Sequence, residues 1–221
     1  MAKQVIVFDV NETLLDLAGL EPRFSELLPA GMMALWFSRM LFNSAVATMS
    51  GVYQPFDQQG IDALVTTGLG AGIEISEEEA RWVVDGMRDL PPHPDVEPAL
   101  EALQDEGIRM ATLTNSSRSM VRDQMGNAGL ARYFEKLLSV ESVGEFKPSP
   151  AAYRHAASSL AVGISEIRLV AAHAWDVTGA IRAGALAAFV ERGRARLGPL
   201  SEKPDIVARD LTGIASSILA H

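Results

Sequence analysis

Six short runs of strand-forming apolar residues recur along this 221-residue chain, and helical patterns separate most of them. The strands are predicted at residues 4–8, 109–113, 136–140, 168–172, 187–190 and 206–207, and helices at 96–106, 119–127, 150–160 and 175–183. Strands that alternate with helices form a parallel sheet that is covered by helices on both faces. The sequence therefore predicts an α/β fold with a Rossmann-like, doubly wound parallel sheet as its core.

The first two predicted strands are separated by roughly a hundred residues, far more than the dozen or so that one crossover connection needs. Helical patterns occur there at 22–28, 32–49, 57–68 and 76–89, and the last begins with Ser-Glu-Glu-Glu, which is typical of a capping box. Three prolines between 91 and 94 restrict the backbone where the chain returns to the sheet. We predict a core of residues 1–15 and 95–221, and an inserted helical cap of residues 16–94 with hinge segments at both ends.

Composition narrows the range of functions. The net charge of −9 argues against nucleic acid as a partner, because nucleic-acid binding needs a basic surface. No apolar stretch reaches the roughly 18–20 residues of a membrane span, so we expect no membrane partner. The absence of cysteine excludes disulfides, thiolate metal sites and a cysteine nucleophile. With no signal-peptide pattern at the start, these features predict a cytoplasmic protein.

Polar side chains follow successive predicted strands. Asp9 ends the first strand, and in an open α/β sheet the ligand crevice lies beyond the carboxyl ends of the strands. Thr114 and Asn115 follow the second strand, Lys147 follows the third, and Asp176 follows the fourth. Each has a plain structural alternative, such as a helix cap or a solvated lysine. An ammonium group close to Asp9 would favour the ionised carboxylate that a nucleophile needs.

This set of residues resembles the motifs of the haloacid dehalogenase superfamily across essentially the whole chain. The superfamily usually has Asp-x-Asp-x-Thr where this chain has Asp9, Asn11 and Thr13. Its phosphatases place a general acid at the second acidic position, and an asparagine cannot exchange a proton. The segments Phe146-Lys147-Pro148, with Tyr153 beyond, and Ala174-Trp175-Asp176 resemble more narrowly the type II 2-haloacid dehalogenases.

The resemblance implies a hydrolase that needs neither metal nor cofactor and acts on a short, anionic 2-haloacid, with a possible homodimer. It assigns Asp9 as the nucleophile, Thr13 as the residue that orients it, and Lys147 as the cation that stabilises it. It implies that Asp176 and Tyr153 support Lys147 and the hydrolytic water. Residues assigned to substrate or halide binding are Asn11, Arg39, Thr114, Asn115, Tyr153, His173 and Trp175.

Three positions depart from the subgroup. It commonly has Leu-Trp-Arg in the cap, where the arginine binds the halide, and this chain has Phe37 in that place. Arg39 is the nearest cation, but it lies two residues further on, about 200° around a helix. His173 replaces an asparagine, and Asn11 replaces a tyrosine. The sequence therefore leaves two alternatives open, a magnesium-dependent phosphatase of the same fold and a non-catalytic binding protein.

Overall fold

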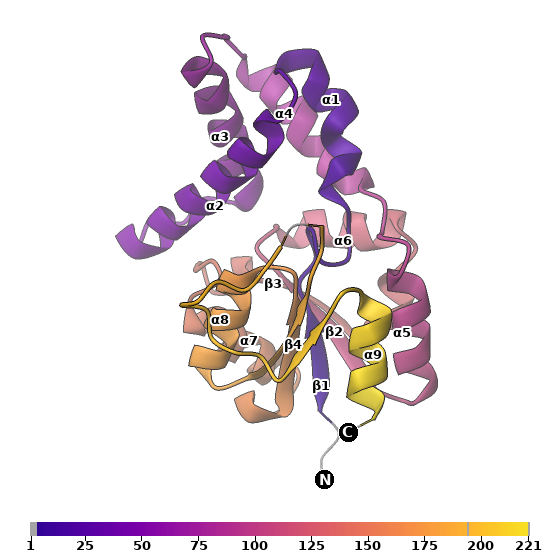
Figure 1. Ribbon diagram of the computed structural model, residues 1–221. Coiled ribbons are helices and arrows are strands. Elements are labelled where there is room, and N and C mark those ends of the chain that lie inside the picture. Colours follow the sequence, from indigo (N-terminus) through magenta and orange to yellow (C-terminus); the bar gives the residue numbers. More distant parts are fainter. Residues whose placement is uncertain (1–3, 194, 221) are drawn as a thin grey trace.

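The computed structural model describes residues 4–193 and 195–220. Six parallel strands form a single sheet in the order β3-β2-β1-β4-β5-β6. Helices on its two faces complete the Rossmann-like architecture (Figure 1), so the predicted fold is confirmed. The strands are β1 (Val5–Phe8), β2 (Arg109–Thr114), β3 (Lys136–Ser139), β4 (Ile167–Ala171), β5 (Leu186–Val190) and β6 (Ile206–Ala208).

β1 occupies the middle of the sheet and is buried along its whole length. Its four residues are at most 1% exposed, because β2 and β4 flank it and helices cover both faces. A strand that is buried on both faces needs a continuous apolar sequence, and Val-Ile-Val-Phe supplies one. This rigid central strand sets the position of the residue that follows it, Asp9.

Five helices accompany the strands of the core. α5 packs against α9, and α7 packs against α8, on opposite sides of the sheet in Figure 1. The helices are α5 (Val96–Asp105), α6 (Arg118–Asn127), α7 (Pro150–Ser159), α8 (Ala174–Ala183) and α9 (Leu211–Leu219). The sequence pattern does not predict α9, whose Asp210 caps the helix by accepting a hydrogen bond from the Gly213 amide.

The long connection between β1 and α5 contains four helices, as predicted. Figure 1 shows them beyond the carboxyl ends of the strands. Ser76 and Glu79 form the predicted capping box at the start of α4. No helix in the described part of the chain, α2 included, has the length and apolar character to cross a membrane. The four are α1 (Glu21–Leu27), α2 (Met32–Ser50), α3 (Phe56–Gly70) and α4 (Glu77–Asp85), and a 3₁₀ helix (Gly86–Asp89) follows α4.

The two linkers of this insertion lie side by side. The Asp16 amide donates to the Pro91 carbonyl at 2.8 Å, and the His93 amide donates to the Leu14 carbonyl at 3.0 Å. The insertion therefore leaves the core and returns to it at the same place. Its division from the core near residues 16 and 94 stays a prediction.

Candidate functional site

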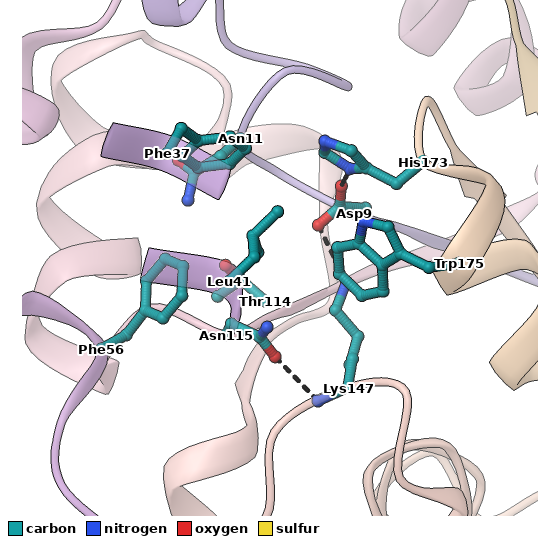
Figure 2. Close-up of a pocket in the computed structure, with 10 residues that line it drawn as sticks. All are labelled: Asp9, Asn11, Phe37, Leu41, Phe56, Thr114, Asn115, Lys147, His173 and Trp175. Atoms are coloured by element: carbon teal, nitrogen blue, oxygen red, sulfur yellow. Dashed lines mark hydrogen bonds and ion pairs between the residues drawn. The ribbon is translucent and has the colours of Figure 1, made fainter. Parts of the chain in front are cut away.

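The carboxyl ends of β1, β2 and β4 bring the predicted polar residues together. Asp9 extends the ladder by one more hydrogen bond, from its amide to the Val170 carbonyl at 3.0 Å. Asn115 and His173 follow the neighbouring strands, so they lie on either side of Asp9 (Figure 2). The parallel register thus places side chains from distant parts of the sequence around one carboxylate.

Lys147 lies at the centre of a buried ion cluster. Its Nζ is 2.8 Å from Asp9 Oδ1, 2.6 Å from Asp176 Oδ2 and 2.9 Å from the Leu113 carbonyl oxygen. An ammonium group has three N–H donors, so these three acceptors fix its position. Lys147 is 3% exposed, Asp9 5% and Asp176 0%. The sequence predicted that Lys147 lies close to Asp9, and the distance confirms it.

The electrostatics of the cluster favour an ionised Asp9. Burial alone would raise the pKa of Asp9, but the Lys147 ammonium and a hydrogen bond from His173 hold this pKa well below its usual range. Burial would likewise lower the pKa of Lys147, but the carboxylates of Asp176 and Asp9 raise it. Burial raises the pKa of Asp176, and the Asp9 charge adds to this in spite of Lys147. The pKa of Asp9 is thus lowered and that of Asp176 raised, so Asp9 is the more acidic of the two.

Both oxygens of Asp9 are held by side-chain partners. Thr13 Oγ1 donates to Oδ2 at 2.9 Å, and it accepts the Ala172 amide at 2.9 Å, which fixes the hydroxyl as a donor toward Asp9. His173 Nδ1 lies 3.1 Å from the same Oδ2. The carboxylate therefore has a fixed orientation, with Oδ1 toward Lys147 and Oδ2 toward His173 (Figure 2).

Asp176 faces the cluster and does not line the pocket. Tyr153 donates its hydroxyl to Asp176 Oδ1 at 2.6 Å, and Lys147 takes the other oxygen. Of the two functions predicted for Asp176, supporting Lys147 is the one that this geometry provides. Gly179 on α8 allows the close packing, because a Cβ there would lie 2.5 Å from both the Tyr153 hydroxyl and Pro148 Cβ.

The pocket has a polar wall from the core and an apolar wall from the insertion. Phe37 and Leu41 of α2, with Phe56 of α3, close it opposite Asp9 (Figure 2). The free volume between the walls is about 10 Å³, close to the minimum that holds one water molecule. The lining residues are Asp9, Asn11, Phe37, Leu41, Phe56, Thr114, Asn115, Lys147, His173 and Trp175.

Six of the predicted site residues line this pocket beside Lys147: Asp9, Asn11, Thr114, Asn115, His173 and Trp175. Asn115 Oδ1 accepts the Lys147 backbone amide at 2.9 Å and so anchors the lysine segment. Asn11 is held by neutral partners, since Gln124 donates to its Oδ1 at 2.9 Å and its Nδ2 donates to Ser116 at 3.1 Å.

Arg39, which the sequence predicts as a substrate-binding residue, lies away from the pocket in the structure. Its Nη1 donates to the Thr66 carbonyl at 2.8 Å and to Thr67 Oγ1 at 3.2 Å, and the residue does not line the pocket. Phe37 faces the pocket, and a residue about 200° around the same helix must face elsewhere. Arg39 therefore links α2 to α3.

Leu41 and Phe56 line the pocket although the sequence does not predict them as pocket residues. Both lie on helices with many buried apolar residues, and nothing in their spacing distinguishes the side that faces the pocket from the side that faces other helices. In the described part of the chain, no three His, Asp or Glu side chains gather in a way that could hold a metal ion.

Comparison with known proteins agrees with this geometry. Residues 3–184 match the family model of haloacid dehalogenase-like hydrolases. The chain is 31% identical over 209 residues to (S)-2-haloacid dehalogenase 2 of Pseudomonas sp. (strain CBS-3), covering 93% of this chain and 91% of that protein. It is 28% identical over 218 residues to haloacetate dehalogenase H-2 of Moraxella sp. (strain B), covering 97% of each.

The solved structure of an L-2-haloacid dehalogenase from Xanthobacter autotrophicus has the same fold throughout. It superimposes with a TM-score of 0.93 at 25% sequence identity, and the match covers 99% of both chains. Sequence and structure thus agree over both the core and the helical insertion. The chain belongs to the family of haloacid dehalogenase-like hydrolases.

Proposed function

We propose that this protein hydrolyses the carbon–halogen bond of a short 2-haloacid and forms a 2-hydroxy acid through an ester on Asp9. The observation that carries the proposal is the Asp9 carboxylate, held ionised 2.8 Å from an immobilised ammonium and facing an apolar wall. The dehalogenase names of the full-length relatives support the same reaction.

In the first step, an Asp9 oxygen attacks C2 of the substrate, and the halide leaves with the bonding electron pair. In the second step, water hydrolyses the ester, releases the 2-hydroxy acid and restores the carboxylate. A halide leaves as a stable anion and needs no proton. The amide of Asn11, which is held by Gln124 and Ser116, is therefore sufficient where a phosphatase would need an acid.

The surrounding residues divide the remaining tasks. Thr13 orients Asp9, Lys147 keeps it ionised, and Asp176 with Tyr153 holds Lys147 in place. In this proposal the substrate carboxylate and the leaving halide contact four further polar and aromatic lining residues, Asn11, Thr114, Asn115 and Trp175.

Binding requires the pocket to open, because its free volume of about 10 Å³ cannot hold a haloacid. The wall formed by α2 and α3 is the part that moves in this proposal, and the paired linkers near Asp16 and Pro91 act as the hinge. Closure would then exclude bulk water and strengthen the electrostatic contacts with the substrate. A cytoplasmic location, predicted from the sequence, and a homodimer, implied by the family resemblance, remain part of the proposal.

The decisive experiment measures halide release from each enantiomer of 2-chloropropionate and from haloacetates, without added metal and with chelator present. We expect turnover by the parent enzyme and none by Asp9→Asn. A single turnover in ¹⁸O-labelled water should place the label in Asp9. A parent enzyme that releases no halide but hydrolyses aryl phosphates only with magnesium would contradict the proposal.

A further inference from the structure

We propose that His173 is a catalytic residue of the second step, and that its Nδ1–H stabilises the oxyanion formed when water attacks the Asp9 ester. This inference rests on the proposed function. It begins from the contact between His173 Nδ1 and Asp9 Oδ2 at 3.1 Å, at a position where the resembling subgroup tends to have asparagine.

The direction of this hydrogen bond follows from its partner. An ionised carboxylate only accepts hydrogen bonds, so Nδ1 carries the proton and donates it to Oδ2. Thr13 is also a donor to Oδ2, at 2.9 Å, because its hydroxyl oxygen already accepts the Ala172 amide. Two donors thus converge on one oxygen, at distances typical of an oxyanion hole.

The number of hydrogen bonds that each Asp9 oxygen accepts identifies the oxygen that attacks the substrate. A carboxylate oxygen accepts about two hydrogen bonds. Oδ2 accepts from Thr13 and His173, whereas Oδ1 accepts only from Lys147 among the described side chains. Oδ1 therefore has room for the substrate carbon. The Oδ1–C2 bond forms as the carbon–halogen bond breaks, and Oδ2 becomes the carbonyl oxygen of the ester.

Hydrolysis then places negative charge on Oδ2. The water oxygen bonds to the Asp9 carboxyl carbon and gives one proton to solvent, and the carbonyl electron pair moves to Oδ2. Collapse breaks the bond from that carbon to Oδ1, which leaves as the alkoxide of the product and takes a proton from the Lys147 ammonium. The new Asp9 carboxyl group returns its remaining proton to Lys147, so the site regains its starting charges.

His173 also borders a second cavity, which is large enough to hold water. This cavity is about 530 Å³ in volume, and His173 and Ala172 form part of its lining, together with Glu12, His93 and Arg192. His173 also lines the pocket at Asp9, so it contributes to the walls of both cavities. The ring stacks on Trp175, with centroids 5.2 Å apart, and contacts Phe37 at 6.0 Å, which fixes its orientation.

The two steps respond to His173 in opposite ways. In ester formation Asp9 loses negative charge, so a donor on Oδ2 stabilises the starting carboxylate more than the transition state. In hydrolysis Oδ2 gains charge, and the same donor stabilises the transition state. Removing it should therefore slow hydrolysis and leave ester formation as fast or faster. A merely structural histidine would not produce this split.

The experiment compares the parent enzyme with His173→Leu, His173→Asn and His155→Leu in rapid mixing with excess 2-chloropropionate. His155 is the control because it is a half-buried histidine that does not line the pocket. For His173→Leu we expect a burst of one halide per chain followed by turnover that is about 10²–10³-fold slower. Intact mass and peptide mapping should show the propionate ester on Asp9. His173→Asn retains an N–H donor and should recover turnover to within about ten-fold of the parent. The control should behave as the parent.

A slower burst without accumulated ester in His173→Leu would overturn this role, and so would an asparagine variant no faster than the leucine variant. A labelled Asp9 also demonstrates that the variant is folded and competent in the first step. If the parent itself releases no halide, the proposed function fails. An active parent whose His173→Leu variant forms no lasting ester removes only the role of His173.

Discussion

The two walls of the pocket differ in polarity. On the core side, Asp9, Lys147 and Asn115 are polar, buried and bound to one another. On the insertion side, Phe37 and Leu41 face them from α2 with no charge of their own. The sheet therefore holds the reacting groups in fixed positions, whereas the insertion contributes shape and the exclusion of water. The expected effects of substitution differ accordingly between the two walls.

Lys147→Met should produce the largest change, because it removes the cation of the core wall. Burial, no longer opposed by the ammonium, would then raise the pKa of Asp9, and ester formation should lose about 10²–10³-fold of its rate at neutral pH. The variant should gain activity as pH rises through the raised pKa of Asp9, because Asp9 must be ionised to attack. The parent should stay active well into the acid range. Halide bursts across pH measure this, with exposed Lys203→Met as control. Identical profiles would contradict the role of Lys147.

Tyr153→Phe tests the hydrogen bond to Asp176, the residue that holds Lys147 in place. The hydroxyl donates to Asp176 Oδ1 at 2.6 Å, and its loss leaves a buried carboxylate short of a donor. The free energy of unfolding should fall by about 1–3 kcal/mol, as measured by urea denaturation. Tyr53→Phe is the matched control, because the buried Tyr53 hydroxyl has no hydrogen-bond partner among the described residues. Equal losses in both variants would show that the Asp176 contact contributes nothing specific.

Phe37→Arg tests whether the apolar insertion wall limits substrate affinity. A guanidinium at this position would face the anionic substrate, and a charge-assisted hydrogen bond would be partly offset by lost contacts with Trp36 and His173. We expect the KM for 2-haloacids to fall by about three- to ten-fold. Steady-state kinetics measure this, with the exposed Ser38→Arg as control. Equal changes in KM for Phe37→Arg and Ser38→Arg would contradict a specific effect of the apolar wall on substrate affinity.

Arg39→Ala should have the smallest effect on catalysis. The side chain bonds to Thr66 and Thr67 on α3, so its loss should lower the free energy of unfolding by about 1 kcal/mol and leave KM and kcat unchanged. Urea denaturation and steady-state assays check the two parts separately. A large rise in KM would mean that Arg39 turns into the pocket when substrate binds.

The sequence was most informative where one physical pattern dominates. Buried strands such as Val5–Phe8 have continuous apolar sequences, and the strand ends identified Asp9 and Lys147 before any geometry was known. α9 was missed because its sequence, Leu-Thr-Gly-Ile-Ala-Ser-Ser-Ile-Leu, contains small and polar residues with weak helix propensity. Its stability comes from the Asp210 cap and from packing on α5, which is a tertiary contact.

Side-chain direction was the part of the site that sequence could not supply. The type and position of Asp176 were predicted, but only the structure shows that its oxygens face Lys147 and Tyr153 and not the pocket. Arg39 illustrates the same limit, because the hydroxyl and carbonyl groups that it bonds belong to another helix. Such choices depend on how helices pack on one another, and the local sequence does not encode that.

The paired linkers bring the two ends of the helical insertion together at the carboxyl edge of the sheet. Because Asp16 meets Pro91 and Leu14 meets His93, the inserted segment begins and ends at neighbouring points on the backbone. A shorter or longer helical segment could therefore be grafted between these points without changing the span that β1 and α5 must bridge. A different inserted segment could therefore change the range of substrates, while Asp9 and Lys147 keep their positions at the ends of the strands.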